Sequence, residues 1–235
     1  MLKQKLKKII YKEKSSSSEF IKYLRKKGAT VGEYTYFFNP RNVKIDTKRL
    51  DYLKIGSYCK ITQGVQFLNH DYSWSVLRKY SNDILPNGGY EIEIGDNVFI
   101  GWNALIMGPV KIGSNVIIGA NSVVTKNIES NSVYAGNPAK KLCTLEEYLK
   151  RKKENILNVA KNEYLHIREI KKENPSIQEL GWFCILFLER TEANKEYIKT
   201  LPFHGDNINE VIDIFNNTKP YFNSYNEFID YCIKE

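Results

Sequence analysis

Apolar residues recur every six positions through the middle of the chain. They fall at Ile94, Ile100, Ile106, Ile112, Ile118 and Val124, and glycine follows at 95, 101, 113 and 119. Four residues after each apolar start comes a second residue, almost always small or β-branched: Val98, Ala104, Val110, Val116, Ser122 and Ile128. An ordinary antiparallel β domain has a period of two and leaves a strict period of six unexplained.

A weaker form of the same period precedes this block. Apolar residues fall six apart at Val31, Phe37, Val43, Ile55, Ile61 and Phe67, and Arg49 interrupts the series. Phe67 and Ile94 are 27 residues apart, which is not a multiple of six, so the two blocks are out of phase. We therefore expect the chain to leave the repeat in a loop over residues 68–93.

A six-residue unit is too short to bury a core by itself. Stacked units bury their apolar columns against one another, β-branched residues suit the short strands, and glycine lets the backbone turn sharply at a corner. The pattern predicts an all-β core over residues 31–142, in which the chain winds as a parallel β-helix.

Helical signals flank this core. Ser18 is a candidate cap for a short helix, Glu19 to Lys27, that Gly28 closes. Capping-box spacings at Thr144–Glu147 and Ser176–Glu179 predict two further helices, the second carrying the apolar run Trp182–Leu188. The chain is thus expected to hold a basic helical arm (1–30), the β-helix with its loop (31–142) and a helical extension (143–235).

The net charge of +8 is concentrated at the N-terminus. Residues 1–60 hold 16 Lys and Arg against 5 Asp and Glu, whereas residues 143–235 hold 13 against 16. This excess suits an acidic glycan or, through peripheral association, an anionic membrane surface, and a solvated helix face is the simpler alternative. No nucleic-acid-binding motif accompanies the charge, so we expect no nucleic-acid partner.

Other features bound the location of the chain. No apolar stretch follows the N-terminal lysines as in a secretory signal, and the longest apolar run is far shorter than the roughly 20 residues of a membrane span. The four cysteines are widely spaced, with no CxxC pair: Cys59, Cys143, Cys184 and Cys232. This argues against a zinc site or a disulfide framework and predicts a cytoplasmic protein, with action at the inner face of the membrane as an alternative.

A family resemblance rests on these residues. The run from Ile94 to Ala104 resembles the central repeat of the left-handed β-helix acetyltransferases of the hexapeptide-repeat superfamily, and the runs Val123–Ile128 and Ala135–Lys140 resemble their last coil and closing turn. The run Leu53–Ile61, with Asn69, His70 and Trp74, is similar to the xenobiotic (chloramphenicol and streptogramin) branch. The segments Gly181–Phe183 and Leu186–Arg190 resemble polysaccharide O-acetyltransferases of capsule and O-antigen clusters.

The resemblance covers about residues 28–142. It implies a left-handed β-helix, acetyl-CoA as co-substrate, no metal, and a homotrimer with sites between subunits. It also implies direct attack of an acceptor hydroxyl on acetyl-CoA.

Acetyl transfer to a hydroxyl needs a base, and histidine is the usual one. Of three histidines, His166 lies in a Lys/Glu-rich helical stretch and His204 in the tail, whereas His70 lies where the chain leaves the repeat and matches the family's catalytic histidine. Asp71 either orients the imidazole, binds acceptor or is an ordinary loop residue. Trp74 is a candidate for stacking on the acceptor or for anchoring the loop. Trp102 is expected at the active site, facing outward after Gly101.

The coenzyme's phosphates call for backbone N–H groups and cations. The resemblance assigns Lys126, Asn137, Pro138 and Lys140 to the end of the β-helix that contacts the coenzyme. Gly101, Gly119 and Ala120 are expected to let the pantetheine arm lie close to the backbone. Cys59 falls at an inward repeat position and is expected to pack rather than to react.

Three functions are compatible with these features. The first is O-acetylation of a bacterial surface polysaccharide or its sugar precursor, with a carbohydrate as acceptor. The second is acetylation of a small hydroxylated xenobiotic such as an antibiotic. The third is a non-catalytic β-helix used as a binding module, which His70 disfavours.

Overall fold

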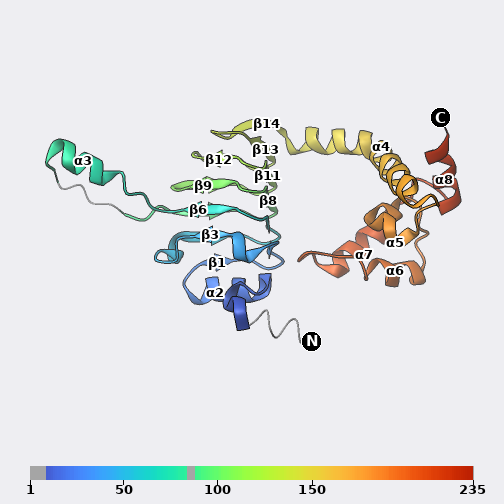
Figure 1. The fold of residues 1–235 in the computed structure, drawn as a ribbon, viewed down its shortest axis with the longest axis horizontal. Helices are drawn as coiled ribbons and strands as arrows, with labels where there is room; N and C mark the ends of the chain where they lie inside the picture. Colours follow the sequence, from blue (N-terminus) through green and yellow to red (C-terminus); the bar gives the residue numbers. More distant parts are fainter. Residues whose placement is uncertain (1–8, 84–87, 235) are drawn as a thin grey trace. The chain divides into compact units, whose positions relative to one another are not determined.

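The computed structural model describes residues 9–83 and 88–234. The first part of the predicted basic arm, four positions of the predicted loop and Glu235 therefore lie outside the described residues. The chain divides into two compact units, one within Met1–Tyr148 and the other within Leu149–Glu235 (Figure 1).

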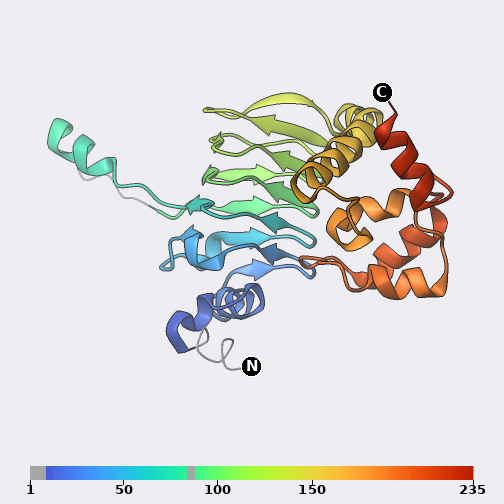
Figure 2. The same ribbon diagram turned by 45° about the vertical axis from the view of Figure 1, so that its right-hand side comes forward.

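The first unit is a coil of short strands stacked into three sheets (Figures 1 and 2). Sheet A has the order β1 (Thr30–Val31), β4 (Leu53–Ile55), β7 (Ile92–Ile94), β10 (Val110–Ile112). Sheet B has the order β14 (Lys140–Thr144), β13 (Ser132–Ala135), β11 (Val116–Ile118), β8 (Val98–Ile100), β5 (Lys60–Ile61), β2 (Tyr36–Phe37). Sheet C has the order β12 (Val123–Val124), β9 (Leu105–Met107), β6 (Gln66–Leu68), β3 (Lys44–Ile45).

Successive strands along the chain belong to different sheets, and the paired strands of each sheet run parallel except β13 and β14. The predicted parallel β-helix is therefore confirmed. Its apolar columns point inward: Ile94, Ile100, Ile106, Ile112, Ile118 and Val124 are at most 3% exposed. Fully burying one such side chain is worth about 1.5–3 kcal/mol, so the repeat itself supplies the core.

The first coil departs from the regular period. Ile94 pairs with Ile112, 18 residues later, whereas Val31 pairs with Ile55, 24 residues later. The 3₁₀ turns η2 (Pro40–Asn42) and η3 (Leu50–Tyr52) lie in this longer coil. Ile45, and not Val43, therefore pairs with Phe67, and the interruption at Arg49 falls in a corner.

Asparagines shape one corner of the later coils. Asn97, Asn115 and Asn131 each adopt a left-handed backbone with φ between 54° and 59°. Their side chains join one coil to the next, since Asn97 Nδ2 donates to Asn115 Oδ1 and Asn115 Nδ2 to Asn131 Oδ1, both at 2.9 Å. Asparagine tolerates this conformation better than most residues.

The N-terminal arm packs on the first coil through η1 (Lys12–Lys14) and α2 (Ser17–Lys26), with Phe20 and Leu24 buried in the β-helix core. The predicted cap Ser18 is wrong by two positions. Ser16 caps α2, because its hydroxyl accepts the backbone N–H of Glu19.

The second unit is helical. Its elements are α4 (Leu145–Lys171), which begins in the first unit, α5 (Ile177–Leu180), η4 (Gly181–Leu186), α6 (Glu192–Ile198), α7 (Ile208–Asn217) and α8 (Tyr225–Ile233). Both predicted capping boxes are confirmed, at Thr144–Glu147 and at Ser176–Glu179. The second helix is shorter than expected. It stops at Leu180, since Gly181 takes a positive φ of 52°, and most of the apolar run lies in η4.

Buried aromatic rings form the core of this unit. Phe228 contacts Tyr164, Phe187 and Phe222 at centroid distances of 5.1–5.8 Å. Among the helices that the structure describes, none combines the length and the apolar character needed to cross a membrane.

Candidate active site

His70 and Asp46 lie side by side, just beyond the carboxyl ends of two neighbouring strands of sheet C. Asp46 directly follows β3 and His70 comes two residues after β6, and the two strands are parallel neighbours. Asp46 Oδ2 is 2.8 Å from His70 Nδ1. The carboxylate side chain is only 16% exposed, whereas the imidazole is 47% exposed. The carboxylate of Asp46 is therefore largely shielded from solvent, whereas the imidazole of His70 is accessible.

This contact defines what the imidazole can do. A carboxylate that accepts the Nδ1–H holds the ring in place and leaves the lone pair on Nε2. An imidazole held this way can take a proton at Nε2 while the carboxylate stabilises the resulting positive charge. Asp46 was missed in the sequence, because it is 24 residues from His70 and outside every motif.

Asp71 makes hydrogen bonds within the loop that follows His70. Its carboxylate accepts the backbone N–H of Ser73 at 2.8 Å, the hydroxyl of Ser73 at 2.7 Å and the hydroxyl of Tyr90 at 2.7 Å. These hydrogen bonds, with Ser73 contributing most, lower the pKa of Asp71. The register of the coils brings Asp46 to the ring, so Asp46 is the carboxylate that the structure places against the imidazole, whereas Asp71 turns into the loop.

Tyr90 and Asn69 draw together the two ends of the loop that carries His70. The backbone N–H of Tyr90 donates to the carbonyl of Asn69 at 2.6 Å. The buried side chain of Asn69 donates to the carbonyl of Arg49 at 2.7 Å. These bonds attach the loop to the first coil at the position of His70.

The predicted loop contains a helix. α3 (Trp74–Ser81) has no buried residue and stands clear of the coils (Figures 1 and 2). Trp74 is half-buried at its start, with Tyr72 edge-on at 4.9 Å and the guanidinium of Arg78 4.5 Å from its ring centre. The described contacts of Trp74 are thus made within the loop itself.

Most of the residues expected to hold the coenzyme share one corner of the β-helix. Phe37, Ile61, Ile100, Ile118 and Tyr134 align across sheet B. After the first four of these residues the chain turns toward sheet C, and after Tyr134 it turns back into β14. The positions two residues further on therefore stack one per coil. In order they are Asn39, Gln63, Trp102, Ala120 and Gly136, and we call this set the corner column.

Trp102 is 56% exposed, and Ala120 and Gly136 are exposed as well. Gly101, Gly119, Asn137 and Pro138 are neighbours in the chain of column residues or lie one position further. The structure thus brings these sequence-predicted residues into a single strip along this corner, in which Gly101 is buried and Gly119 half-buried.

The glycines of this strip are required by the packing of the coils. A Cβ on Gly101 would lie 2.5 Å from the backbone nitrogen of Ala120, and one on Gly119 would lie 2.7 Å from Cβ of Ala135. Coil-on-coil contact is therefore a sufficient reason for glycine at both positions, apart from any ligand.

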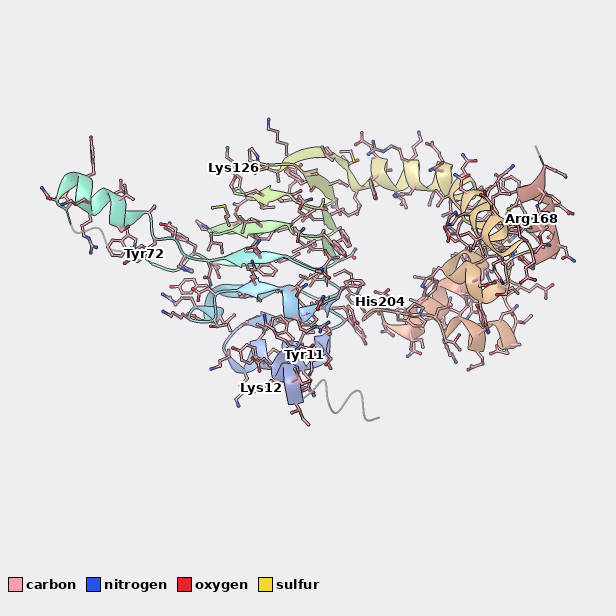
Figure 3. The ribbon with its side chains drawn as sticks, in the orientation of Figure 1. Tyr11, Lys12, Tyr72, Lys126, Arg168 and His204 are labelled. Carbon is pink, nitrogen blue, oxygen red and sulfur yellow. The ribbon has the colours of Figure 1, made fainter. Side chains whose placement is uncertain are left out.

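The two lysines assigned to the coenzyme lie apart. Lys126 follows β12 and so lies at the same end of sheet C as Asp46 and His70, where Figure 3 shows it on the same side of the coils as Tyr72. Lys140 begins β14 beside Ala135, next to the corner column. Both side chains are exposed. Within one chain, His70 follows strand β6 and Trp102 precedes the neighbouring strand β9. The length of these strands therefore separates the two residues.

Other candidate groups have structural surroundings. Cys59 is fully buried, its thiol lies 3.2 Å from the carbonyl of Gly95, and burial raises its pKa, so it packs as expected. His166 and His204 belong to the second unit. Within residues 9–83 and 88–234, no cluster of three or more His, Cys, Asp or Glu side chains could hold a metal ion.

Comparison with known proteins agrees with this fold. Residues 91–126 match the family described as bacterial transferase hexapeptide (six repeats). Protein CapG of Staphylococcus aureus is 40% identical over 141 residues, which cover 60% of this chain and 80% of CapG. A chloramphenicol acetyltransferase of Klebsiella aerogenes is 31% identical over 138 residues, 48% of this chain and 65% of that enzyme. A maltose O-acetyltransferase structure from Clostridium difficile 630 aligns with a TM-score of 0.40 at 25% identity, covering 60% of this chain and 81% of that one.

A left-handed parallel β-helix of six-residue repeats is the fold of the hexapeptide class of transferases. The chain belongs to the bacterial hexapeptide-repeat transferases, and its relatives make it an acetyltransferase.

Proposed function

We propose that the chain transfers the acetyl group of acetyl-CoA to a hydroxyl of a bacterial surface polysaccharide or of its sugar precursor, with His70 as general base. The observation that carries this proposal is the 2.8 Å contact between His70 Nδ1 and Asp46 Oδ2. It prepares the exposed Nε2 to accept a proton, which is what acylation of a hydroxyl requires. Asp46 is a positioning residue in this scheme.

His70 carries the transferred proton through both halves of the proposed reaction. His70 Nε2 takes the proton of the acceptor hydroxyl while the hydroxyl oxygen bonds to the acetyl carbonyl carbon. The bond from that carbon to sulfur then breaks, and the proton on His70 goes to the departing thiolate. The negative charge that develops on the carbonyl oxygen needs hydrogen-bond donors, for which exposed backbone N–H groups of the corner column are candidates.

The corner column suits an extended coenzyme. Beyond Trp102 the next two members, Ala120 and Gly136, are small and exposed, so an arm laid along them meets backbone rather than bulky side chains. Asn137, Pro138 and Lys140 lie at the upper end, where an amide and a cation suit phosphate groups.

The separation of His70 from this column supports a homotrimer. In one chain, His70 and the corner column lie at opposite ends of the strands of sheet C. A complete site therefore needs the His70 of one subunit beside the corner column of its neighbour. Gel filtration with light scattering should then give three times the 27.4 kDa chain mass, and a monomer with full activity would contradict this arrangement.

Two considerations bear on the acceptor. The basic N-terminal region suits an acidic glycan, and it supports the polysaccharide. The similarity to chloramphenicol acetyltransferase supports the second candidate, a small hydroxylated xenobiotic. A cytoplasmic location, expected from the cysteines, belongs to the same proposal, and all four cysteines are free thiols.

An acceptor screen tests the function. Purified chain with isotopically labelled acetyl-CoA should be offered surface polysaccharides, their sugar precursors and chloramphenicol-like drugs, and mass spectrometry should locate the new ester. Transfer to a carbohydrate hydroxyl that His70→Ala abolishes is the expected result. Transfer to the drug alone would favour the second candidate, and no transfer to anything with acetyl-CoA bound would favour a binding module.

A further inference from the structure

A basic hollow lies at the lower end of the corner column. One part, about 500 Å³, lies between the N-terminal turns and the first coil, and an adjoining part of about 550 Å³ continues over the starts of β3 and β6. Lys14, Arg41 and Gln63 line both parts, so we treat them as one hollow and call it the N-terminal basin. Its size is in the range of small-ligand sites. Trp102 lines it too, which makes the basin continuous with the column.

The charged residues that are described in the lining of the basin are all basic. Lys14, Arg41 and Lys44 line it, and none of its described lining residues is Asp or Glu. Of these three cations, none forms an ion pair with a carboxylate among the residues that the structure describes. Exposed cations on proteins are commonly balanced by interspersed carboxylates, so a hollow lined by one sign of charge concentrates counter-ions of the opposite sign.

Two of these cations make contacts between the N-terminal arm and the first coil. Lys14 Nζ donates to the carbonyl of Val43 at 2.9 Å, and the guanidinium of Arg41 lies 4.5 Å from the ring centre of Tyr11. Burial, only partly offset by Glu13, lowers the pKa of Lys14. An anion in the basin would reduce the cost of keeping this partly desolvated ammonium charged.

The N-terminus of α2 adds to the positive potential of the basin. Ser15, Ser16 and Ser17, which precede and begin α2, line the basin. The N-terminus of a ten-residue helix carries partial positive charge. It thus faces the same hollow as the three cations.

The remaining walls suit a sugar. The rings of Tyr36 and Phe38 stand edge to face with centroids 5.2 Å apart, and Asn39 Nδ2 donates to Gln63 Oε1 at 3.0 Å. Aromatic rings offer apolar surface to a sugar ring, and side-chain amides offer both donors and acceptors to its hydroxyls.

We propose that the N-terminal basin is the acceptor subsite and that it selects a hydroxylated acceptor bearing a carboxylate or a phosphate, through Lys14, Arg41 and Lys44. This inference rests on the proposed function and names its substrate class. The basin lies below Trp102 in the column, whereas the residues suited to the coenzyme's phosphates lie above it. The column thus orders the coenzyme, the reacting group and the charged acceptor along one corner.

Binding to the full-length His70→Ala chain tests this without turnover. Calorimetry should compare methyl glucoside with methyl glucuronide and with glucose 6-phosphate. The anionic sugars should bind about tenfold more tightly than the neutral one, since a charge-assisted contact is worth about that factor. The preference should shrink as salt rises. The stronger of the two anionic sugars identifies carboxylate or phosphate as the recognised group, and equal binding of all three would overturn the proposal.

Charge variants locate the recognition. In the His70→Ala background, Arg41→Gln and Lys44→Gln should each remove most of the anionic preference, and Arg41→Lys should restore part of it. Lys26→Gln, an equal charge change on an exposed position of α2, should change nothing. If Lys26→Gln weakens anionic binding as much as the basin variants do, the effect is general charge and the proposal fails.

Kinetics of the chain with His70 intact separate the basin from the coenzyme site. Arg41→Gln should raise the KM of an anionic acceptor about tenfold and leave the KM of acetyl-CoA unchanged. A rise confined to acetyl-CoA would make the basin a coenzyme phosphate site and overturn the proposal. Anionic preference in binding without acetyl transfer to any acceptor would overturn the proposed function and leave the basin as an acid-binding site.

Discussion

Asp46 Oδ2 lies 2.8 Å from His70 Nδ1 across two neighbouring coils of the β-helix. The two residues end adjacent parallel strands, so any change that shifts the register of the first coil also shifts the carboxylate away from the imidazole. The position of His70, the proposed base, therefore depends on the stacking of the N-terminal coils as well as on its own loop.

Replacing Asp46 by Asn should lower kcat by about tenfold to a hundredfold or more with little change in either KM. The amide keeps the shape but no longer stabilises a positively charged imidazole, and it admits the wrong tautomer. Steady-state kinetics check this, and Asp71→Asn is the matched control. An equal or larger loss of kcat in Asp71→Asn would return the positioning role to Asp71.

Replacing His70 by Ala should reduce transfer by at least about a thousandfold while acetyl-CoA binding stays within about twofold. Loss of the general base affects the transition state and leaves the bound ground state intact. Product formation by mass spectrometry and coenzyme binding by calorimetry measure the two effects. Near-normal turnover in this variant would remove His70 from catalysis.

Replacing Lys140 by Ala should raise the KM of acetyl-CoA about threefold to tenfold with kcat nearly constant. A cation beside the coenzyme's phosphates contributes to binding in the ground state and the transition state alike. Lys22→Ala, on α2 at the other end of the β-helix, is the control for general charge. An unchanged KM in the Lys140 variant would exclude the residue from the coenzyme site.

Replacing Gly101 by Ala should lower the free energy of unfolding by about 1–3 kcal/mol, because the added Cβ would lie 2.5 Å from the backbone nitrogen of Ala120. Denaturant unfolding measures this. Gly88→Ala serves as control, since its Cβ would meet nothing within 4 Å. Equal stability of the two variants would show that the coils can separate without cost at this corner.

The second unit should lose stability in acid partly through Glu179. Hydrogen bonds from Lys171 and then Ser176 lower its pKa from 4.5 to about 2 in the folded chain. Since the folded pKa is the depressed one, this contribution is complete above about pH 4.5 and disappears as pH falls toward 2. Unfolding followed by the helical signal in circular dichroism should show a weaker pH dependence in Glu179→Gln between pH 2 and 5. An unchanged slope would contradict the role of this carboxylate.

Patterns of residues close together in the sequence predict much of the architecture. The six-residue period specified the apolar columns, and capping boxes at Thr144 and Ser176 placed two helix starts to the residue. The pattern failed where other groups competed. Ser16 rather than Ser18 caps α2. Gly181 ends α5 before the apolar run that the sequence predicted to be part of the same helix.

The sequence by itself determined the β-helix, its interruption and the position of His70, because these depend on residues near one another in the chain. Only the tertiary structure decided that Asp46 faces His70, that Trp102 and Ala120 share a column with Asn39 and Gln63, and that a basic basin closes its lower end. The physical reason lies in the register of the coils. The coils differ in length by the turns and loop inserted into them, so spacing in the chain does not give the spacing between coils. The hydrogen bonds between stacked strands and the buried apolar columns set that spacing. They thereby decide which residues of different coils become neighbours in the site.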